Sequence, residues 1–328
     1  MIHRRSLLTA ALLVPLVTAC VPGESGTATP ASGRLRLDYA YYNPLSLVIR
    51  QQRWLEDALP GTEVTWVLSA GSNKANENLR GETIDLGSTA GAAALQARAN
   101  GTPIKTVGIY TRPEWAALVV AKDSPITEVS GLKGKKVAAT KGTDPYFFLL
   151  QALEEAGLDG ADVEVVNLQH ADGKTALERG DVDAWSGLDP LMAQSQVDSG
   201  TKLIYRNASF NSYGFLNARE EFLAEHPDLA QKVLDAYERA RAWIVEHPDD
   251  AVRLLASEAK LAPEVARVVL KERTEVEISP VPGPDQRAVL ERILPTLVRE
   301  SQVRSEQEAK TALDSLFVPE FAEKAGAS

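Results

Sequence analysis

The sequence has few cysteines and histidines, and this scarcity excludes several classes of site. Its 328 residues include one cysteine, so it cannot form an internal disulfide bond, a CxxC pair or a cysteine metal cluster. Of four histidines, His226 and His247 precede prolines at expected helix starts, which leaves too few for a zinc triad. The HExxH, GxSxG and GxxxxGK(S/T) motifs do not occur. We therefore expect no catalytic residue, no cofactor and no metal site.

Positive charge is also in short supply. The chain has 35 Lys and Arg against 45 Asp and Glu, which gives a net charge of −10 and a pI near 5.1. A protein that binds nucleic acid usually carries a basic stripe, so we expect no nucleic-acid partner. Hydrophobic residues make up 44% and charged residues 24%, as in a soluble globular protein, and the length allows two domains.

The single cysteine, Cys20, closes a segment that has the pattern of an export signal. Two arginines near the start precede an apolar run over residues 7–18, which is too short for a membrane span of about 20 residues. The run ends in VTAC, which resembles the bacterial lipobox, where the signal is cut before a cysteine that is then lipidated. We predict a lipoprotein signal peptide over residues 1–19 and a lipid anchor on Cys20 outside the cytoplasm. An ordinary signal peptide with a chance cysteine is the alternative, and Sec or twin-arginine export stays open.

The segment that follows differs in composition from the body of the chain. Residues 20–33 are rich in Gly, Pro, Ser, Thr and Ala, which predicts a flexible tether. Two similar units then alternate strand patterns with helix patterns, and this order predicts mostly parallel sheets with helices on both faces. The expected strands cover residues 35–41, 63–68, 83–87 and 104–110, then 136–140, 163–168, 182–186 and 203–205. From residue 219 onward the pattern is nearly all helical.

Small and hydroxylated residues gather where the expected strands give way to helices. Ligands of open α/β sheets bind beyond the carboxyl ends of the strands, where helix starts direct N–H groups and a positive dipole end. Five turns of the two units have this chemistry, so we expect a donor-rich crevice between two lobes. The candidate ligand-binding residues are Asn43, Ser69, Ser72, Ser88, Thr89, Trp115, Thr143, Asp144, Trp185 and Asp189.

Each candidate also has a purely structural interpretation. Ser, Thr, Asn and Asp are common helix N-caps, and for any single turn capping is the simpler role. Trp115 and Trp185 would either wall an apolar part of the ligand or pack in the core. Asp189 would either pair with an amino group of the ligand or cap the helix after it, and Asp144 and Asn43 have the same two interpretations.

Several motifs together carry a family resemblance. Residues 34–274 resemble the extracytoplasmic substrate-binding proteins of ABC importers, and most of all the branch that takes up aliphatic sulfonates, taurine and nitrate. The similar segments are GETIDLG at 81–87, DSPI at 123–126, LKGKKVA at 132–138, KGT at 141–143, GDVDAW at 180–185 and Asp189-Pro190.

The resemblance implies a two-lobed clamshell of the type II periplasmic-binding-protein class, with α/β architecture in each lobe. Lobe 1 would comprise residues 34–118 plus 213–328, lobe 2 residues 119–212, with crossings near 118–121 and 213–216. A small anionic organic solute, an aliphatic sulfonate above all, would bind between the lobes and favour closure. The resemblance further implies a lipid-anchored protein, expected to be a monomer, that delivers this solute to an ABC permease with its ATPase.

Two departures from the family lie where the ligand should bind. Leu188 stands where sulfonate binders often carry an aromatic residue, and residues 88–92 replace a Gly-Asp-Xaa-Pro type of turn. They leave the solute open among a sulfonate, taurine, nitrate and other small molecules. Two alternative functions would use the same fold: an enzyme of pyrimidine (thiamine-precursor) metabolism, and a ligand sensor without transport.

Overall fold

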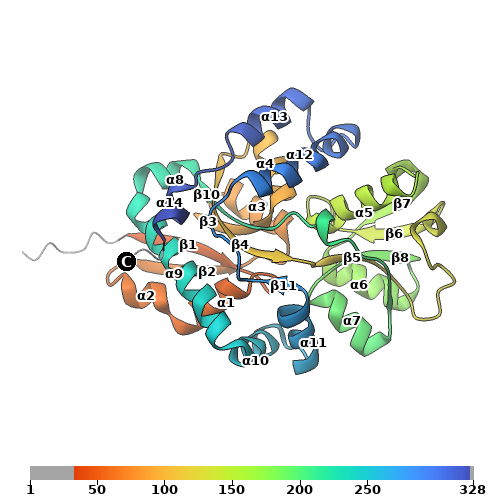
Figure 1. Cartoon of the computed structure of the whole chain (residues 1–328), viewed down its shortest axis with the longest axis horizontal. Helices are drawn as coiled ribbons and strands as arrows, with labels where there is room; N and C mark the ends of the chain where they lie inside the picture. Colours follow the sequence, from red (N-terminus) through yellow and green to blue (C-terminus); the bar gives the residue numbers. More distant parts are fainter. Residues whose placement is uncertain (1–32, 326–328) are drawn as a thin grey trace, which may run out of the picture.

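The computed structural model describes residues 33–325. The predicted signal peptide, Cys20 and all but the last residue of the predicted tether lie outside the described residues. Within 33–325, no helix combines the length and apolar character that a membrane crossing requires. Two β-sheets lie one after the other along the long axis, with helices packed around both (Figure 1).

The first sheet has six strands, in the order β11-β4-β10-β3-β1-β2. The strands are β1 (Arg34–Tyr39), β2 (Glu63–Leu68), β3 (Leu86–Ala90), β4 (Ile104–Pro113), β10 (Gly214–Arg219) and β11 (Thr274–Glu275). Strand β1 pairs in parallel with β2 and β3, whereas β10 runs antiparallel to both β3 and β4.

The second sheet has five strands, in the order β7-β6-β8-β5-β9. They are β5 (Ala116–Val120), β6 (Lys136–Ala139), β7 (Glu164–Asn167), β8 (Ala184–Leu188) and β9 (Lys202–Tyr205). Strand β6 is parallel to β7 and β8, and β5 is antiparallel to β8 and β9. The predicted α/β sheets are confirmed, but β10 and β5 add antiparallel pairs because they are the strands at which the chain enters each sheet after a crossing.

Helices follow the strands in the two units and then fill the carboxyl-terminal part. The helices of the two units are α1 (Pro44–Gln52), α2 (Trp54–Ala58), α3 (Ser72–Arg80), α4 (Gly91–Ala99), α5 (Asp144–Glu155), α6 (His170–Arg179) and α7 (Leu191–Ser199). The later ones are α8 (Glu220–Glu225), α9 (Pro227–Glu246), α10 (Pro248–Ala259), α11 (Pro263–Arg267), α12 (Pro284–Arg299), α13 (Glu306–Asp314) and α14 (Glu320–Lys324). Short helical turns η1 (Val129–Leu132), η2 (Gly160–Asp162), η3 (Ala208–Phe210) and η4 (Val268–Glu272) connect them.

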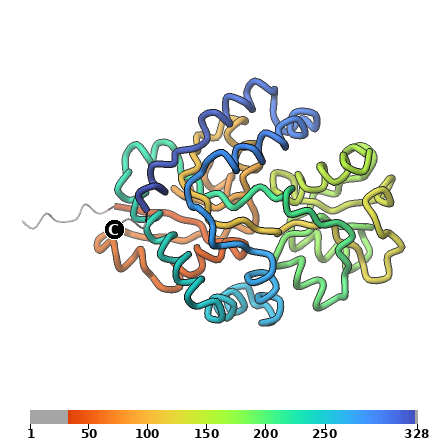
Figure 2. Tube along the Cα trace, in the orientation of Figure 1, coloured from red at the N-terminus to blue at the C-terminus, as the bar shows by residue number. Residues whose placement is uncertain are grey.

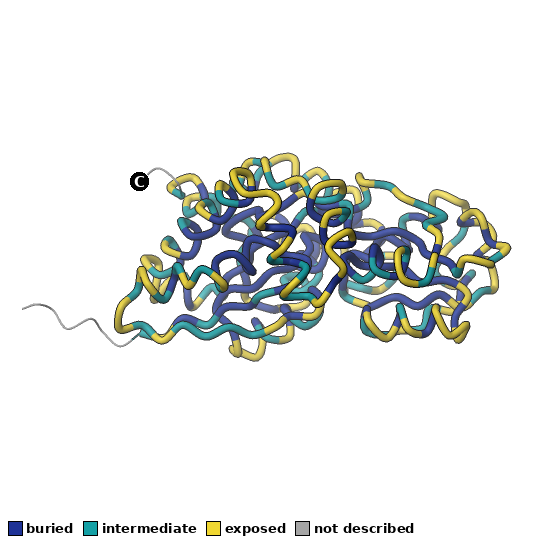
Figure 3. Tube along the Cα trace, turned by 90° about the horizontal axis from the view of Figure 1, so that it is seen from below, coloured by how far each residue is buried: buried dark blue, intermediate teal, exposed yellow. Residues whose placement is uncertain are grey.

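The inner strands of both sheets are the most buried part of the molecule's β-structure. Strands β3, β5 and β8 are buried at every position, as expected for strands with helices on both faces of a sheet. Buried segments run through the interior of both halves of the molecule, and the exposed positions lie on the outside (Figure 3). Helix α12 packs against α4, which follows a strand of the first sheet, and against α5, which follows a strand of the second sheet.

The chain passes between the sheets twice (Figure 2). The first crossing is residues 114–115, because β5 already belongs to the second sheet. The predicted lobe boundary at 118/119 and the predicted crossing at 118–121 therefore need correction, since this apolar run is a buried strand and not a linker. The second crossing ends at residue 213, directly before β10, so the predicted crossing at 213–216 also falls mostly within a sheet strand.

Candidate ligand-binding cleft

Turns from both sheets meet in a cleft that contains two adjoining cavities. The outer chamber, bounded by Leu68, Leu188, Leu191 and Leu261 among others, has a volume of about 290 Å³. The inner cavity is bounded by Ser72, Trp115, Thr143 and Asp144 among others, and its volume is about 10 Å³. Tyr42, His170 and Leu188 line both of them, so the two cavities form one continuous site.

A larger depression of about 630 Å³ lies elsewhere, at the amino ends of β1 and β2. Its arginines are already neutralised, because Arg36 and Arg219 both form ion pairs with the buried carboxylate of Asp85. Its lining comes from the first sheet and from the starts of α8 and α9, so no residue of the second sheet contributes to it. The cleft between the sheets is therefore the better candidate for the functional site.

The inner cavity lies where three helices begin. Ser72 is the first residue of α3, Asp144 that of α5 and His170 that of α6, and all three residues line this cavity. The partial positive charge of a helix amino terminus favours anions, and three such ends converge here from both sheets. The sequence predicts Asn43, Ser72 and Thr143 at helix starts, and of these three residues Ser72 and Thr143 line the inner cavity.

Asp144 joins the two crossings to each other. Trp115 of the first crossing donates its indole N–H to the carboxylate at 2.8 Å, and Ser212 of the second donates both its backbone N–H, at 2.8 Å, and its hydroxyl. The Ser212 oxygen in turn accepts from the Ala92 N–H of α4 at 2.9 Å. Burial raises the pKa of the Asp144 carboxyl to about 6. Asp144 and Trp115 are thus at the inner cavity, but their polar atoms already bind each other.

Asn43 and Ser88 lie behind the cleft in a closed polar network. The Asn43 amide donates to the hydroxyls of Ser88 and Tyr237, at 2.7 and 3.0 Å, and its oxygen caps α1 by accepting from Ser46 N–H. Ser88 donates its hydroxyl to Asp38 at 2.8 Å, and burial raises the pKa of that carboxyl to about 6. Neither predicted residue lines the outer chamber or the inner cavity, and the polar atoms of both side chains already have hydrogen-bond partners in the protein.

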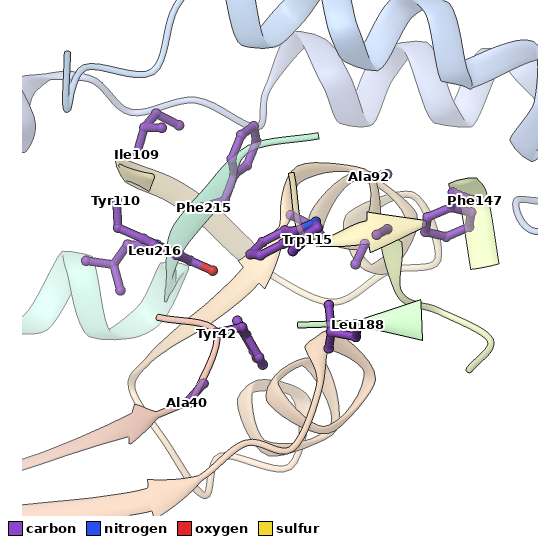
Figure 4. Close-up of a cluster of buried hydrophobic side chains, with 14 of the residues drawn as sticks. Ala40, Tyr42, Ala92, Ile109, Tyr110, Trp115, Phe147, Leu188, Phe215 and Leu216 are labelled. Atoms are coloured by element: carbon purple, nitrogen blue, oxygen red, sulfur yellow. The ribbon is translucent and has the colours of Figure 1, made fainter. Parts of the chain in front are cut away.

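Two other candidates are core residues. The Thr89 hydroxyl accepts from the Asn217 amide at 2.7 Å and is fully buried within the first sheet. Trp185 has no exposed surface and packs in a separate core cluster of the second sheet with Val119 and Met192. Trp185 is therefore a core residue, which was one of its two predicted roles. Trp115 instead lines the inner cavity and packs edge-on against Tyr42 (Figure 4).

Ser69 and Asp189 both border the outer chamber. The Asp189 carboxylate caps α7 by accepting from Ala193 N–H at 2.9 Å, and it pairs with Arg273 at 3.1 Å. Burial raises the pKa of Asp189, while Arg273 opposes that effect. Arg273 stands directly before β11 of the first sheet and also donates to Gln196 of α7, at 2.7 Å. Asp189 therefore caps α7, which was one of its two predicted roles. The partner of its carboxylate is the guanidinium of Arg273, which links the two lobes, and not an amino group of the ligand.

The candidate set lacks His170, which the structure places at the centre of the site. Its side chain is 2% exposed, its Nδ1 lies 3.1 Å from the Thr140 hydroxyl, and its Nε2 has no partner among the described residues. Burial lowers the pKa of His170 to about 3. A histidine at a helix start after a strand has the same pattern as the chosen turns, and that signal was available in the sequence.

Gly71 lies against the second lobe at the site. A Cβ atom at this position would lie 2.8 Å from Nε2 of His170 on the second lobe. The backbone here is extended, with φ 176°, so glycine is required by this contact and not by the backbone conformation. The turn from β2 to α3 can therefore close onto His170 only because residue 71 has no side chain.

Comparison with known proteins places the chain among binding proteins. The model of the family described as NMT1/THI5 like matches residues 51–251. A protein of Escherichia coli (strain K12), named for binding aliphatic sulfonates, is 30% identical over 281 residues, which are 84% of this chain and 86% of that one.

Solved structures give the same result. The alkanesulfonate-binding protein SsuA from Xanthomonas axonopodis pv. citri, bound to MOPS, superposes with a TM-score of 0.77 at 25% identity, over 87% of this chain and 99% of that one. The periplasmic aliphatic sulphonate binding protein SsuA from Escherichia coli gives 0.74 at 26% identity, over 88% and 93%. The predicted periplasmic-binding-protein fold is confirmed.

Proposed function

Because the chain belongs to the NMT1/THI5-like family, we propose that it is the solute-binding component of an ABC importer and that its ligand is an aliphatic sulfonate. The relatives described above are binding proteins and not enzymes, and solute binding is the role they support. The observation that carries the proposal is the cleft itself, in which helix starts from both lobes surround one site.

The inner cavity suits an anionic head group. A sulfonate spreads one negative charge over three acceptor oxygens, and helix amino termini bind such a group without a full countercharge. The starts of α3, α5 and α6 would supply this field. The Ser72 oxygen accepts from the Ala90 N–H at 2.9 Å, which leaves its hydroxyl hydrogen for the ligand, whereas the Thr143 hydroxyl already donates to the Thr140 carbonyl at 2.6 Å. The Asp144 carboxylate at this cavity accepts hydrogen bonds from the Trp115 indole and from Ser212, so its oxygens are already bound by donors of the two crossings.

Ligand entry requires the lobes to separate. A volume of about 10 Å³ is close to the minimum that holds one water molecule. A sulfonate head is larger, so it would enter a more open form and then favour closure by contacting both lobes. Residues 114–115 and 206–213 connect the lobes and would act as the hinge.

The remaining parts of the proposal concern the cell envelope. Cys20 would carry the lipid that holds the protein outside the cytoplasm, and the closed form would be recognised by the permease with its ATPase. Exchange of Cys20 for Ser should release the exported protein from the membrane fraction, and mass spectrometry should then find no lipid-modified amino terminus. Retention of the variant in the membrane would contradict the anchor.

Thermal unfolding with a panel of solutes tests the ligand. The purified chain is mixed with 1-butanesulfonate, nitrate, sulfate or short carboxylates at matched ionic strength. A ligand present at 100 times its Kd should raise the unfolding free energy by about 2.7 kcal/mol. Stabilisation by butanesulfonate but not by nitrate, sulfate or a short carboxylate supports the proposal, and the absence of any response to the sulfonate refutes it.

A further inference from the structure

A buried carboxylate borders the cleft that is proposed to receive an anion. Among the described residues that line the outer chamber, Asp189 and Lys74 are the two with a formal charge. Leu188, the neighbour of Asp189 in the chain, lines both the chamber and the inner cavity, so the carboxylate stands near the point where the two cavities join. Charges attract and repel strongly where little water separates them. The way in which the charge of Asp189 is compensated therefore affects which solutes the cleft accepts.

We propose, on the basis of the proposed function, that Arg273 determines the charge specificity of the cleft, because it cancels the charge of Asp189 from the opposite lobe. Arg273 lines neither cavity, so it is a positioning residue that acts on the ligand only through Asp189. With the arginine in place the cleft accepts an anionic solute. Without it, the same cleft would favour a solute that carries an amino group.

The pair of Arg273 and Asp189 is buried and held by several contacts. One guanidinium nitrogen lies 3.2 and 3.1 Å from the two carboxylate oxygens, and the other donates to the Gln196 amide oxygen at 2.7 Å. The two side chains are 9% and 3% exposed, so water and salt screen the pair only weakly. The Arg273 carbonyl also accepts from the Glu114 N–H at 2.7 Å, which holds the arginine at the first crossing.

Asp189 has a structural reason to be a carboxylate. It accepts from the Ala193 N–H at 2.9 Å at the start of α7, and an acidic residue stabilises a helix amino terminus. Its own backbone N–H donates to the Trp115 carbonyl at 2.9 Å, which keeps it beside the first crossing. The helix cap thus brings a negative charge to a cleft proposed for anions, and Arg273 resolves that conflict.

Two further cations near Asp189 are already paired. Arg206 donates to both carboxylate oxygens of Glu114, at 2.9 and 2.6 Å. Lys74 pairs with Glu77 at 2.7 Å, and its side chain is 44% exposed, so water screens its charge. Neither cation can take the place of the buried arginine without giving up its own partner.

Calorimetric titration of the wild type, two single variants and the double variant tests this inference. The probe is 1-propanesulfonate at constant ionic strength. Arg273→Met leaves the carboxylate uncompensated and should weaken binding at least tenfold. Asp189→Asn keeps an oxygen for the helix cap and leaves the arginine uncompensated, so it should strengthen binding at least threefold. The double variant has neither charge and should return to within threefold of the wild type.

Taurine provides a second readout, because an ammonium group replaces the terminal methyl group of propanesulfonate in it. The ratio of the taurine affinity to the propanesulfonate affinity should rise at least tenfold in Arg273→Met. In the double variant it should stay within threefold of the wild-type ratio. If Arg273 only held the lobes together, its loss would weaken both ligands alike, with or without Asp189→Asn, and the ratio would not change.

Arg299→Met is the matched control. Arg299 of α12 pairs with Glu154 of α5 at 3.0 Å, so it also joins a carboxyl-terminal helix to the second lobe, but it lines neither cavity. The affinity of this variant should stay within twofold of the wild type, with the ratio unchanged. Circular dichroism reports whether each variant is folded. If Arg273→Met does not fold, Asp189→Asn decides, since stronger binding is expected only from the charge.

The outcomes separate this inference from the function on which it rests. If the wild type does not bind propanesulfonate, the proposed function fails. If it binds, the proposed function stands, and any of three results refutes the role of Arg273: an Arg273→Met variant with wild-type affinity, a double variant as weak as Arg273→Met, or an Asp189→Asn variant weaker than the wild type.

Discussion

The two ends of the cleft are built on different physical principles. At the inner end, hydrogen bonds such as those of Asp144 fix the positions of both crossings around about 10 Å³. At the outer end, about 290 Å³ is enclosed mainly by aliphatic side chains that impose no direction on a bound group. Directional bonds favour one shape and charge of head group, whereas apolar contact tolerates many groups of suitable size. The two ends of the cleft therefore differ in how strictly they define the geometry of a bound group.

The largest effect is expected at the inner end, from Asp144→Ala. The substitution leaves the buried indole N–H of Trp115 and the N–H of Ser212 without their acceptor, and each unpaired donor costs about 1–3 kcal/mol. We expect a loss of about 3 kcal/mol in unfolding free energy, measured by urea denaturation, together with loss of ligand binding. Asp285→Ala is the matched control, an exposed aspartate in the first turn of α12. Equal effects of the two substitutions would contradict the role given to Asp144.

The substitution Gly71→Ala should prevent full closure of the lobes without lowering the stability of the protein. The new methyl group would lie 2.8 Å from Nε2 of His170, so the lobes could not close fully, while the extended backbone accepts alanine without strain. We expect at least tenfold weaker sulfonate binding, about 1.4 kcal/mol, with the unfolding midpoint unchanged. Small-angle scattering with saturating ligand should show a more open form than the wild type.

Gly283→Ala is the control for that substitution. Gly283 also has an extended backbone, with φ −162°, and a Cβ there would approach no atom closer than 3.9 Å. The Gly283→Ala variant should bind the sulfonate with the same affinity as the wild type. Unchanged affinity in Gly71→Ala as well would show that the turn from β2 to α3 does not limit closure.

The smallest expected effect is a pH dependence of binding through His170. In the closed form burial lowers its pKa to about 3, whereas an exposed histidine titrates near 6.5. Closure therefore favours the neutral ring: this contribution to affinity is complete above pH 6.5 and is lost as the pH falls below it. Between pH 7.5 and 5.5 we expect affinity to fall about tenfold.

The variant His170→Asn isolates this contribution. Asp144, with its pKa raised to about 6, lines the same cavity and titrates in the same range, so the comparison is between slopes of affinity against pH. The slope should flatten in His170→Asn and stay unchanged in His247→Asn, where the histidine is exposed. Parallel slopes in all three proteins would exclude His170 as the group responsible.

Whether a predicted site residue lines a cavity depends on contacts with residues that are far from it in the sequence. Ser69, Ser72, Trp115, Thr143, Asp144 and Asp189 line the two cavities, and their role in ligand binding stays a prediction. Asn43, Ser88, Thr89 and Trp185 do not, because partners such as Asp38, Tyr237 and Asn217 lie far from them in the sequence. Sequence patterns report which residues stand at strand ends, but not which of those side chains are already bound.

The amino-acid sequence by itself determined the two α/β sheets and the edge at which they meet, since alternation, helical spacing and turn residues are local properties of the chain. Only the tertiary structure decided where the lobes divide, that Asp189 faces Arg273 instead of a ligand amine, and that Gly71 lies against His170. Those outcomes depend on which distant segments come into contact, and burial then decides which polar groups remain free to bind a solute.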